Sequence, residues 1–202
     1  MPSDSLDETT NNGPTSATPA GVPGTGFCLY IRRIRQEERA GIGHPRTVSE
    51  YQCYWNGEAI PELAGQTVER GGPGDNSSNG VQKHRRIEAG EYPLSIQDGE
   101  HYKTYHYIAN GFPYPGLALD DTGHRSAILL HPCHDDNNGY LSSIGCINPA
   151  IGLTNADSRV DLADSRARVI AIIDTMKQKL GAAFPHAGSI SGAVIVIEGE
   201  PT

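Results

Sequence analysis

The chain has little of several residue types that mark particular protein classes. Its 202 residues include one Trp, three Phe and two Met, and hydrophobic residues make up 37% of the sequence. No run of about 18 consecutive apolar residues occurs, so the sequence predicts no transmembrane helix. The 24 Gly and 14 Pro indicate many turns, and we therefore expect a body rich in loops and short strands.

Positive charge is also scarce. Sixteen Lys and Arg stand against 24 Asp and Glu, which gives a formal net charge of −8. This excess of negative charge repels phosphate backbones and anionic lipids, so we expect neither nucleic acid nor a membrane as a partner. The first 25 residues lack a basic segment followed by an apolar one, and no standard signal peptide is expected. We expect synthesis in the cytoplasm, with export by another route if the protein acts outside it.

Residues 1–25 differ in composition from the rest of the chain. They are rich in Ser, Thr, Pro, Gly and Asn and carry almost no bulky apolar side chain. Such a segment cannot bury enough apolar surface to offset the entropy lost on ordering. We predict a disordered leader over 1–25 and a single domain over 26–202, which is long enough to form its own core.

The domain has more strand signals than helix signals. Runs of β-branched, aromatic and apolar residues predict strands at 27–31, 47–55, 65–70, 87–96, 101–108, 127–131, 145–148 and 190–197. The pair Asn56-Gly57 between two of these runs predicts a hairpin turn. One helix is predicted, capped by Asp157 or Ser158 and ending at Gly181. The fold class is therefore mainly β (α+β) with one packed C-terminal helix.

The segment from His131 to Asn148 carries the strongest chemical signal. An apolar run ends at His131, a polar loop follows, and Cys146 then stands between Gly145 and Ile147. A cysteine thiol is mostly protonated at neutral pH, so a neighbouring base is what makes it a useful nucleophile. A glycine before it lets a substrate carbonyl approach the backbone closely. The pattern indicates acyl-transfer chemistry.

The run Ser143-Ile144-Gly145-Cys146-Ile147-Asn148 resembles the signature of the L,D-transpeptidases, the YkuD-type cysteine enzymes. Their signature is Ser/Thr-His-Gly-Cys, an aliphatic residue, then Arg or Asn. Leu130-His131 resembles the earlier histidine of that family, which ends a strand and acts as the base. The run 86–92 resembles the strand that leads in from the family's turn. The likeness covers roughly residues 27–155.

A closer likeness is to a group of small phage and bacterial proteins related to that fold. They carry a run like 125–132, with Leu130-His131-Pro132 at its end, followed by Gly-Cys-Ile. One position departs from the transpeptidase signature. Ile144 stands where those enzymes have a second histidine, and the spacing from His131 to Cys146 is shorter than theirs. The base role is thereby left to His131.

The resemblance implies a β-sandwich or barrel and a specific mechanism. His131 would take the proton of Cys146, and the thiolate would attack a carbonyl of a peptidoglycan stem peptide, for example at meso-diaminopimelate. A thioester would form, and water or an amine would resolve it. The backbone N–H groups of Gly145 and Cys146, with Ser143 nearby, would form the oxyanion hole. This chemistry needs no metal and no cofactor.

Further residues are candidates for substrate binding. Asn148 occupies the Arg/Asn position of the family, where it would orient the loop or a substrate carboxylate. Arg125 is a candidate to pair with a substrate carboxylate, because a guanidinium binds one in a fork. His134, His106 and His124 are candidates to supply a second imidazole through space.

The sequence thus predicts a cysteine enzyme whose partner is the peptidoglycan stem peptide. A phage lysis or tail-associated product fits this prediction, as does an antibacterial toxin effector that acts in the periplasm or cell wall. Such an effector would also meet a secretion machinery and a cognate immunity protein. The rival hypothesis is a non-catalytic module with the same fold that holds stem peptides or a partner, with Ile144 marking a lost site.

A zinc-stabilised structural domain is a third hypothesis. Residues of the types that bind zinc stand at His131, Cys133, His134, Asp135 and Cys146. Their spacing in the sequence does not match the paired Cys or His spacing of usual zinc sites. Together with Cys28 and Cys53, the cysteines allow three disulfide connectivities.

Overall fold

The computed structural model describes residues 18–108, 113–135 and 138–201. The strands are β1 (Phe27–Glu37), β2 (Arg46–Trp55), β3 (Glu58–Arg70), β4 (Gly90–Ile96), β5 (Leu117–Leu119), β6 (Leu129–Leu130), β7 (Asn148–Ala150) and β8 (Ser189–Glu198). The helices are α1 (Ser78–Gln82), α2 (Leu162–Leu180) and the 3₁₀ turn η2 (Gly181–Ala183). The predicted fold class, mainly β with one long helix near the C-terminus, is confirmed at this level.

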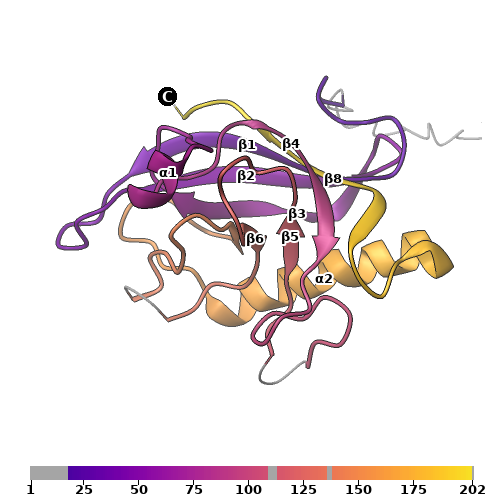
Figure 1. Ribbon diagram of the computed structural model, residues 1–202. Helices are drawn as coiled ribbons and strands as arrows, with labels where there is room; N and C mark the ends of the chain where they lie inside the picture. The colour runs from indigo at the N-terminus through magenta and orange to yellow at the C-terminus, as the bar shows by residue number, and fades with distance from the viewer. Residues whose placement is uncertain (1–17, 109–112, 136–137, 202) are drawn as a thin grey trace, which may run out of the picture.

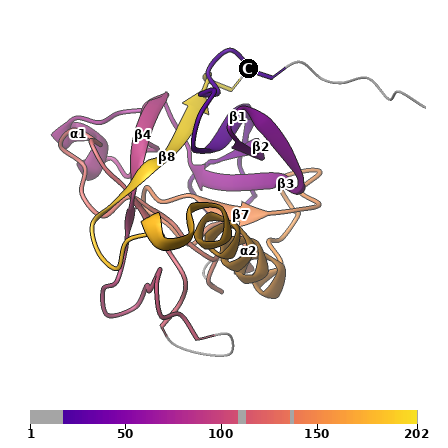
Figure 2. The same cartoon turned by 90° about the vertical axis from the view of Figure 1, so that its right-hand side faces the viewer.

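All eight of these strands belong to one curved sheet, in the order β6-β5-β4-β8-β1-β2-β3-β7. A parallel bridge between Leu130 and Ile147 joins the strand at one edge to the residue before the strand at the other. The sheet is therefore almost closed into a barrel. The helix α2 lies along one side of it and packs against β7 and β3 (Figures 1 and 2). Within the described residues, the helices are too short or too polar to cross a membrane.

The hairpin between β2 and β3 forms at the predicted turn. Asn56 and Gly57 have φ angles of 51° and 80°, a combination that matches the right-handed twist of the flanking strands. The Asn56 side chain also accepts a hydrogen bond from the N–H of Gly26, with an N–O distance of 2.8 Å. The turn therefore fixes the register of the long β1–β2–β3 meander.

The main core lies between the inner face of the sheet and α2. The helix contributes Val169, Ile172, Ile173 and Met176, each completely buried, as its apolar spacing predicts. Gly181 ends the helix with a φ of 54°, also as predicted.

The helix begins later than predicted. Its N-cap is Asp161, whose side chain accepts a hydrogen bond from the N–H of Asp164. The expected caps, Asp157 and Ser158, belong to a preceding turn instead. There the Ser158 hydroxyl accepts hydrogen bonds from the N–H groups of Thr154 and Asn155.

The strand predicted at 101–108 is wrong. This segment has only isolated bridges, at Tyr102 and Lys103. The Asp98 carboxylate accepts hydrogen bonds from the backbone N–H groups of Thr104 (2.7 Å) and Tyr105 (3.2 Å). These are N–H groups that a strand would offer to a neighbouring strand, so the aromatic alternation here belongs to a loop held by side chains.

The predicted leader divides into two parts. Residues 1–17 lie outside the described residues. Residues 18–25 contact the domain: the Thr18 hydroxyl donates to the carbonyl of Gly57 (3.1 Å), and Val22 packs beside Tyr30 and Val196. Contacts with the domain therefore begin before the expected boundary at residue 26.

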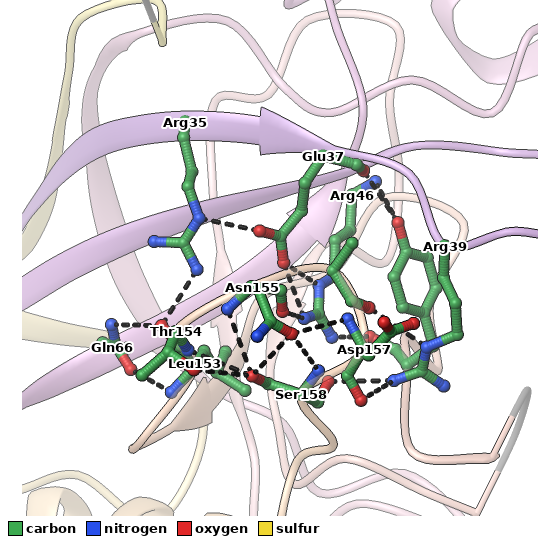
Figure 3. A network of polar contacts seen from close by, with 12 residues as sticks. Arg35, Glu37, Arg39, Arg46, Gln66, Leu153, Thr154, Asn155, Asp157 and Ser158 are labelled. Atoms are coloured by element: carbon green, nitrogen blue, oxygen red, sulfur yellow. Dashed lines mark hydrogen bonds and ion pairs between the residues drawn. The ribbon is translucent and has the colours of Figure 1, made fainter.

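Buried arginines connect the sheet to its loops. The guanidinium of Arg46 is fully buried and contacts the carboxylate of Glu37 at 2.6 Å and the carbonyls of Tyr140 (3.0 Å) and Asn155 (3.1 Å). Figure 3 shows Arg35 and Arg39 reaching the same loop from β1 and its end, with the Glu37 carboxylate between Arg35 and Arg46. This network anchors the segment 153–158, which leads from β7 to α2.

We expect Arg46→Ala to lower the free energy of unfolding by about 3–5 kcal/mol, because the carbonyls of Tyr140 and Asn155 and one oxygen of the Glu37 carboxylate lose their partner, while Arg35 keeps the other oxygen. Denaturant unfolding measures this. The exposed pair of Arg32 and Glu50 is the control, and Arg32→Ala should cost less than about 1 kcal/mol. Equal losses in both variants would contradict a special role for the buried pair.

Candidate active site

The bridge between β6 and the start of β7 positions the predicted thiol and imidazole. The N–H of Ile147 donates to the carbonyl of Leu129 (2.8 Å), and the N–H of His131 donates to the carbonyl of Ile147 (3.1 Å). Leu130 and Ile147 are buried in the core. Because neighbouring side chains on a strand alternate, Cys146 and His131 project from the opposite face of this pair.

Both residues line one cleft of about 680 Å³. Its walls come from five parts of the chain, namely the loop 97–102, the segment 127–131, the loop 141–146, His44 just before β2, and Arg70 at the end of β3. The curvature of the sheet brings these segments together.

The thiol of Cys146 is half-buried and held by the backbone. Its Sγ accepts a hydrogen bond from the N–H of Leu129 and donates to the carbonyl of Ala127, both at 3.4 Å. Ala127 has a φ of 54°, a strained conformation for a residue with a Cβ. Burial raises the pKa of the Cys146 thiol, while the Leu129 N–H, the Ser143 hydroxyl and the charge of Arg125 lower it in part. The thiol is therefore protonated at neutral pH.

His131 is buried and has a defined tautomer. Its Nδ1 lies 2.8 Å from the carbonyl of Pro132, so Nδ1 carries the proton and Nε2 keeps its lone pair. Burial lowers the pKa of His131 to about 3. The ring packs against Tyr102 and His134, with centroid distances of 4.6 Å and 5.4 Å.

These surroundings favour the neutral form of both groups. The thiolate–imidazolium pair of the predicted mechanism is therefore not favoured before a substrate binds. The neutral imidazole with a lone pair on Nε2 is nevertheless the form that a general base requires.

Ser143 occupies the predicted oxyanion hole. Its hydroxyl oxygen accepts hydrogen bonds from the N–H of Gly145 (2.9 Å) and from the N–H of Cys146. The two donors are thus adjacent and point to one place, as an oxyanion hole requires. A substrate oxygen would have to replace the Ser143 hydroxyl there.

The guanidinium of Arg125 packs so closely against Gly145 that position 145 has no room for a side chain. A Cβ at position 145 would lie 2.1 Å from Nη2 of Arg125 and 3.0 Å from Cδ1 of Ile128. The buried guanidinium of Arg125 donates to the carbonyls of Asp75 (3.0 Å) and Ile144 (3.5 Å). Arg125 therefore anchors the loop that carries Cys146, and carboxylate binding by Arg125 stays a prediction.

Asn148 lies beside His131. Its side-chain Nδ2 donates to the carbonyl of His131 (3.0 Å), and its Oδ1 accepts from the hydroxyl of Ser142 (3.3 Å). This geometry fits the expected role of orienting the loop. It also keeps the His131 ring in place, because Nδ2 lies 3.4 Å and 3.5 Å from the two ring nitrogens.

Among the candidates for a second imidazole, His134 packs against the ring of His131. Its Nε2 is 2.5 Å from the hydroxyl of Tyr102, and its ring packs on that of Tyr114. None of the three candidates is among the described residues that line the cleft, where His44 and His101 are the other imidazoles besides His131. Tyr102, which forms part of the wall, comes from the loop that the sequence misassigned to a strand.

Among the described residues, no group of three or more His, Cys, Asp or Glu is placed to hold a metal ion, so the structure offers no ligand set for the predicted zinc. All four cysteines are free thiols. Cys133 is buried, and its Sγ contacts the carbonyl of His134 and the hydroxyl of Ser142, both at 3.4 Å. Cys146 is thus available as a thiol.

Comparison of the chain with protein-family models, with curated proteins and with solved structures gave no match.

The burial of His131 predicts a pH dependence of stability. The unfolded state takes up a proton near pH 6.5 and the folded state only near pH 3, so the folded state loses stability as the pH falls below 6.5. One such proton contributes about 1.4 kcal/mol per pH unit. We expect His131→Asn to remove this contribution. Unfolding curves of both proteins between pH 7 and pH 4.5 measure the difference, and parallel pH profiles would contradict it.

Alkylation by iodoacetamide should modify Cys146 first, because the other three cysteines are buried. We expect the rate to rise with pH and its midpoint to lie above 9, the ordinary value for the thiol. Arg125→Gln should move the midpoint further up, since it removes a positive charge beside the thiol, and Arg125→Lys should restore it in part. Mass spectrometry of the labelled protein measures these rates. A midpoint near pH 7 in the native protein would contradict the expected effect of burial.

Proposed function

We propose that this protein is a cysteine enzyme that acts on peptidoglycan stem peptides, by L,D-transpeptidase or L,D-carboxypeptidase chemistry. The observation that carries the proposal is the placement of Cys146 and His131 on the same face of one strand pair, in one cleft. Two adjacent backbone N–H groups beside the thiol add to it. The resemblance of 143–148 to the transpeptidase signature suggests the substrate class.

The proposed reaction begins with proton transfer from Sγ of Cys146 to Nε2 of His131. The sulfur forms a bond to the substrate carbonyl carbon, and the carbonyl oxygen takes the negative charge into the space between the N–H groups of Gly145 and Cys146. The tetrahedral intermediate collapses to a thioester as the leaving amine takes the proton from His131. Water or an acceptor amine then attacks the thioester, with His131 again accepting the proton, and the thiol is regenerated.

The buried surroundings of His131 support this role in one respect. When Nε2 takes the proton, the positive imidazole keeps its Nδ1–H donated to the carbonyl of Pro132, which stabilises the charge and fixes the ring. Binding of a peptide over the cleft would also exclude water, so the opposite charges of thiolate and imidazolium would attract each other more strongly.

Because peptidoglycan lies outside the cytoplasm, the proposed site of action is the periplasm or cell wall. A phage lysis product and an exported antibacterial effector both fit that location. The second fits a partnership with a secretion machinery and an immunity protein.

A second function is a non-catalytic module that holds stem peptides in the same cleft. The occupied amides favour it, because the Ser143 hydroxyl already fills the place of an oxyanion. The neutral state of both His131 and Cys146 favours it as well.

Digestion of purified muropeptides, followed by mass spectrometry, separates the two. We expect the wild type to remove or exchange a terminal amino acid and Cys146→Ala to do neither. His131→Asn should lower the rate by about 10²–10⁴-fold, the usual contribution of a general base. Cys133→Ala, which removes a buried thiol nearby, is the matched control and should stay active. Unchanged muropeptides with the wild type would contradict the enzyme proposal, and binding of the same muropeptides would then support the module.

A further inference from the structure

Within the described residues, one guanidinium that lines the Cys146 cleft has two N–H-bearing nitrogens without a hydrogen-bond partner. Arg70 is the last residue of β3 and lines the cleft. Its Nε and Nη1 are buried, yet neither has a hydrogen-bond partner in the part of the chain that the structure describes. Buried donors are nearly always satisfied in native proteins, because an unpaired one has lost its water without replacement. Arg70 as a whole is only half-buried, so an acceptor supplied by a ligand in the cleft would pair with these nitrogens once the side chain shifts toward it.

Arg70 differs in this respect from the other arginines near the cleft. Arg125 donates to backbone carbonyls and Arg46 binds both a carboxylate and carbonyls. Those two side chains hold loops in place. Arg70 has no such structural task among the described residues, and its charge faces the space that a substrate would enter.

A second groove, of about 340 Å³, adjoins the cleft and shares His44 and Arg70 with it. Its other ionisable lining residues are Lys83, His84 and Arg85. The described residues that line this groove include no acidic side chain, and the carboxylate of Asp75 contacts Arg85 only at 3.9 Å. On a protein with a net charge of −8, such a groove concentrates positive potential at one end of the cleft.

The geometry points to an anion subsite. We propose that Arg70, with this basic groove, binds a carboxylate of the peptide whose carbonyl is attacked by Cys146. This inference rests on the proposed function for its substrate class. A planar guanidinium with unpaired N–H donors suits a carboxylate, which accepts two hydrogen bonds in one plane. The role that the sequence suggested for Arg125 is thus given to Arg70.

His44 adds to the same subsite. It lines both the cleft and the groove, which places it at their junction, and its ring packs on that of Tyr140 with a centroid distance of 5.9 Å. Burial and then the charge of Arg70 lower the pKa of His44. At neutral pH the imidazole is therefore uncharged, and Arg70 supplies the fixed charge of the junction.

A binding measurement on the unreactive full-length Cys146→Ala protein tests the inference. The probe is the tetrapeptide L-Ala-γ-D-Glu-meso-diaminopimelyl-D-Ala, together with analogues in which one carboxylate at a time is a carboxamide. We expect one analogue to bind at least about tenfold more weakly than the acid, the size of a charge-assisted hydrogen-bonded pair. Adding Arg70→Met should abolish this difference, and Arg70→Lys should restore part of it. Isothermal titration calorimetry measures each affinity.

The matched control is Arg32→Met, which removes an exposed arginine outside the cleft and should leave the acid-to-amide ratio unchanged. If Arg70→Met does not fold, the Nε–H resonance of Arg70 in the otherwise intact protein gives a second readout. It should shift on adding the acid peptide and not with the critical carboxamide. An unchanged acid-to-amide ratio in Arg70→Met, an unmoved resonance, or no binding of any peptide would overturn the inference.

This result and that of the muropeptide digestion are distinguishable. Arg70-dependent discrimination together with unchanged muropeptides would support the subsite and contradict the enzyme. Active digestion with no dependence of binding on Arg70 would support the enzyme and overturn the subsite.

Discussion

The hydrogen bonds that join Leu129 and His131 to Ile147 are the constraint on which the candidate site depends. They bring together the two edges of the sheet, and they also set Cys146 and His131 on one face. Strands β6 and β7 are only two and three residues long, so pairing alone cannot keep them in position. Buried arginines do so from outside the strands, since Arg125 holds the loop before Cys146 and Arg46 holds the loop after β7.

Burial has two opposing effects on the chemistry of this site. It keeps the His131 imidazole unprotonated and therefore able to accept a proton, but it also makes the protonated form costly. It keeps the Cys146 thiol protonated, although the nearby guanidinium and backbone N–H favour the thiolate. Formation of the thiolate–imidazolium pair therefore depends on a bound substrate. A residue that holds the substrate, such as Arg70, then also affects the protonation of the two groups.

Local patterns predicted local structure well. Asn56-Gly57 and Gly181 need backbone angles that few residues adopt readily, so the hairpin turn and the helix end could be located from sequence. The strand predicted at 101–108 was wrong because the side chain of Asp98, just before the segment, accepts hydrogen bonds from its backbone N–H groups, and an alternation of aromatic residues does not indicate such bonds. The predicted catalytic pair shares one cleft because both members belong to one short unit. Arg70 and Tyr102 reach that cleft from separate segments, and no spacing in the sequence signals their meeting.

In the resting site, the Ser143 hydroxyl accepts the hydrogen bonds of the Gly145 and Cys146 N–H groups and so acts as an internal ligand. Two kinds of reagent would therefore depend on different groups of the site. An alkylating agent develops no oxyanion and meets only the thiol, whereas an acyl donor competes with an internal ligand for the same two amides. Labelling of Cys146 would then measure access to sulfur alone. Screens for covalent ligands based on simple electrophiles would overlook the selectivity that this serine imposes on carbonyl compounds.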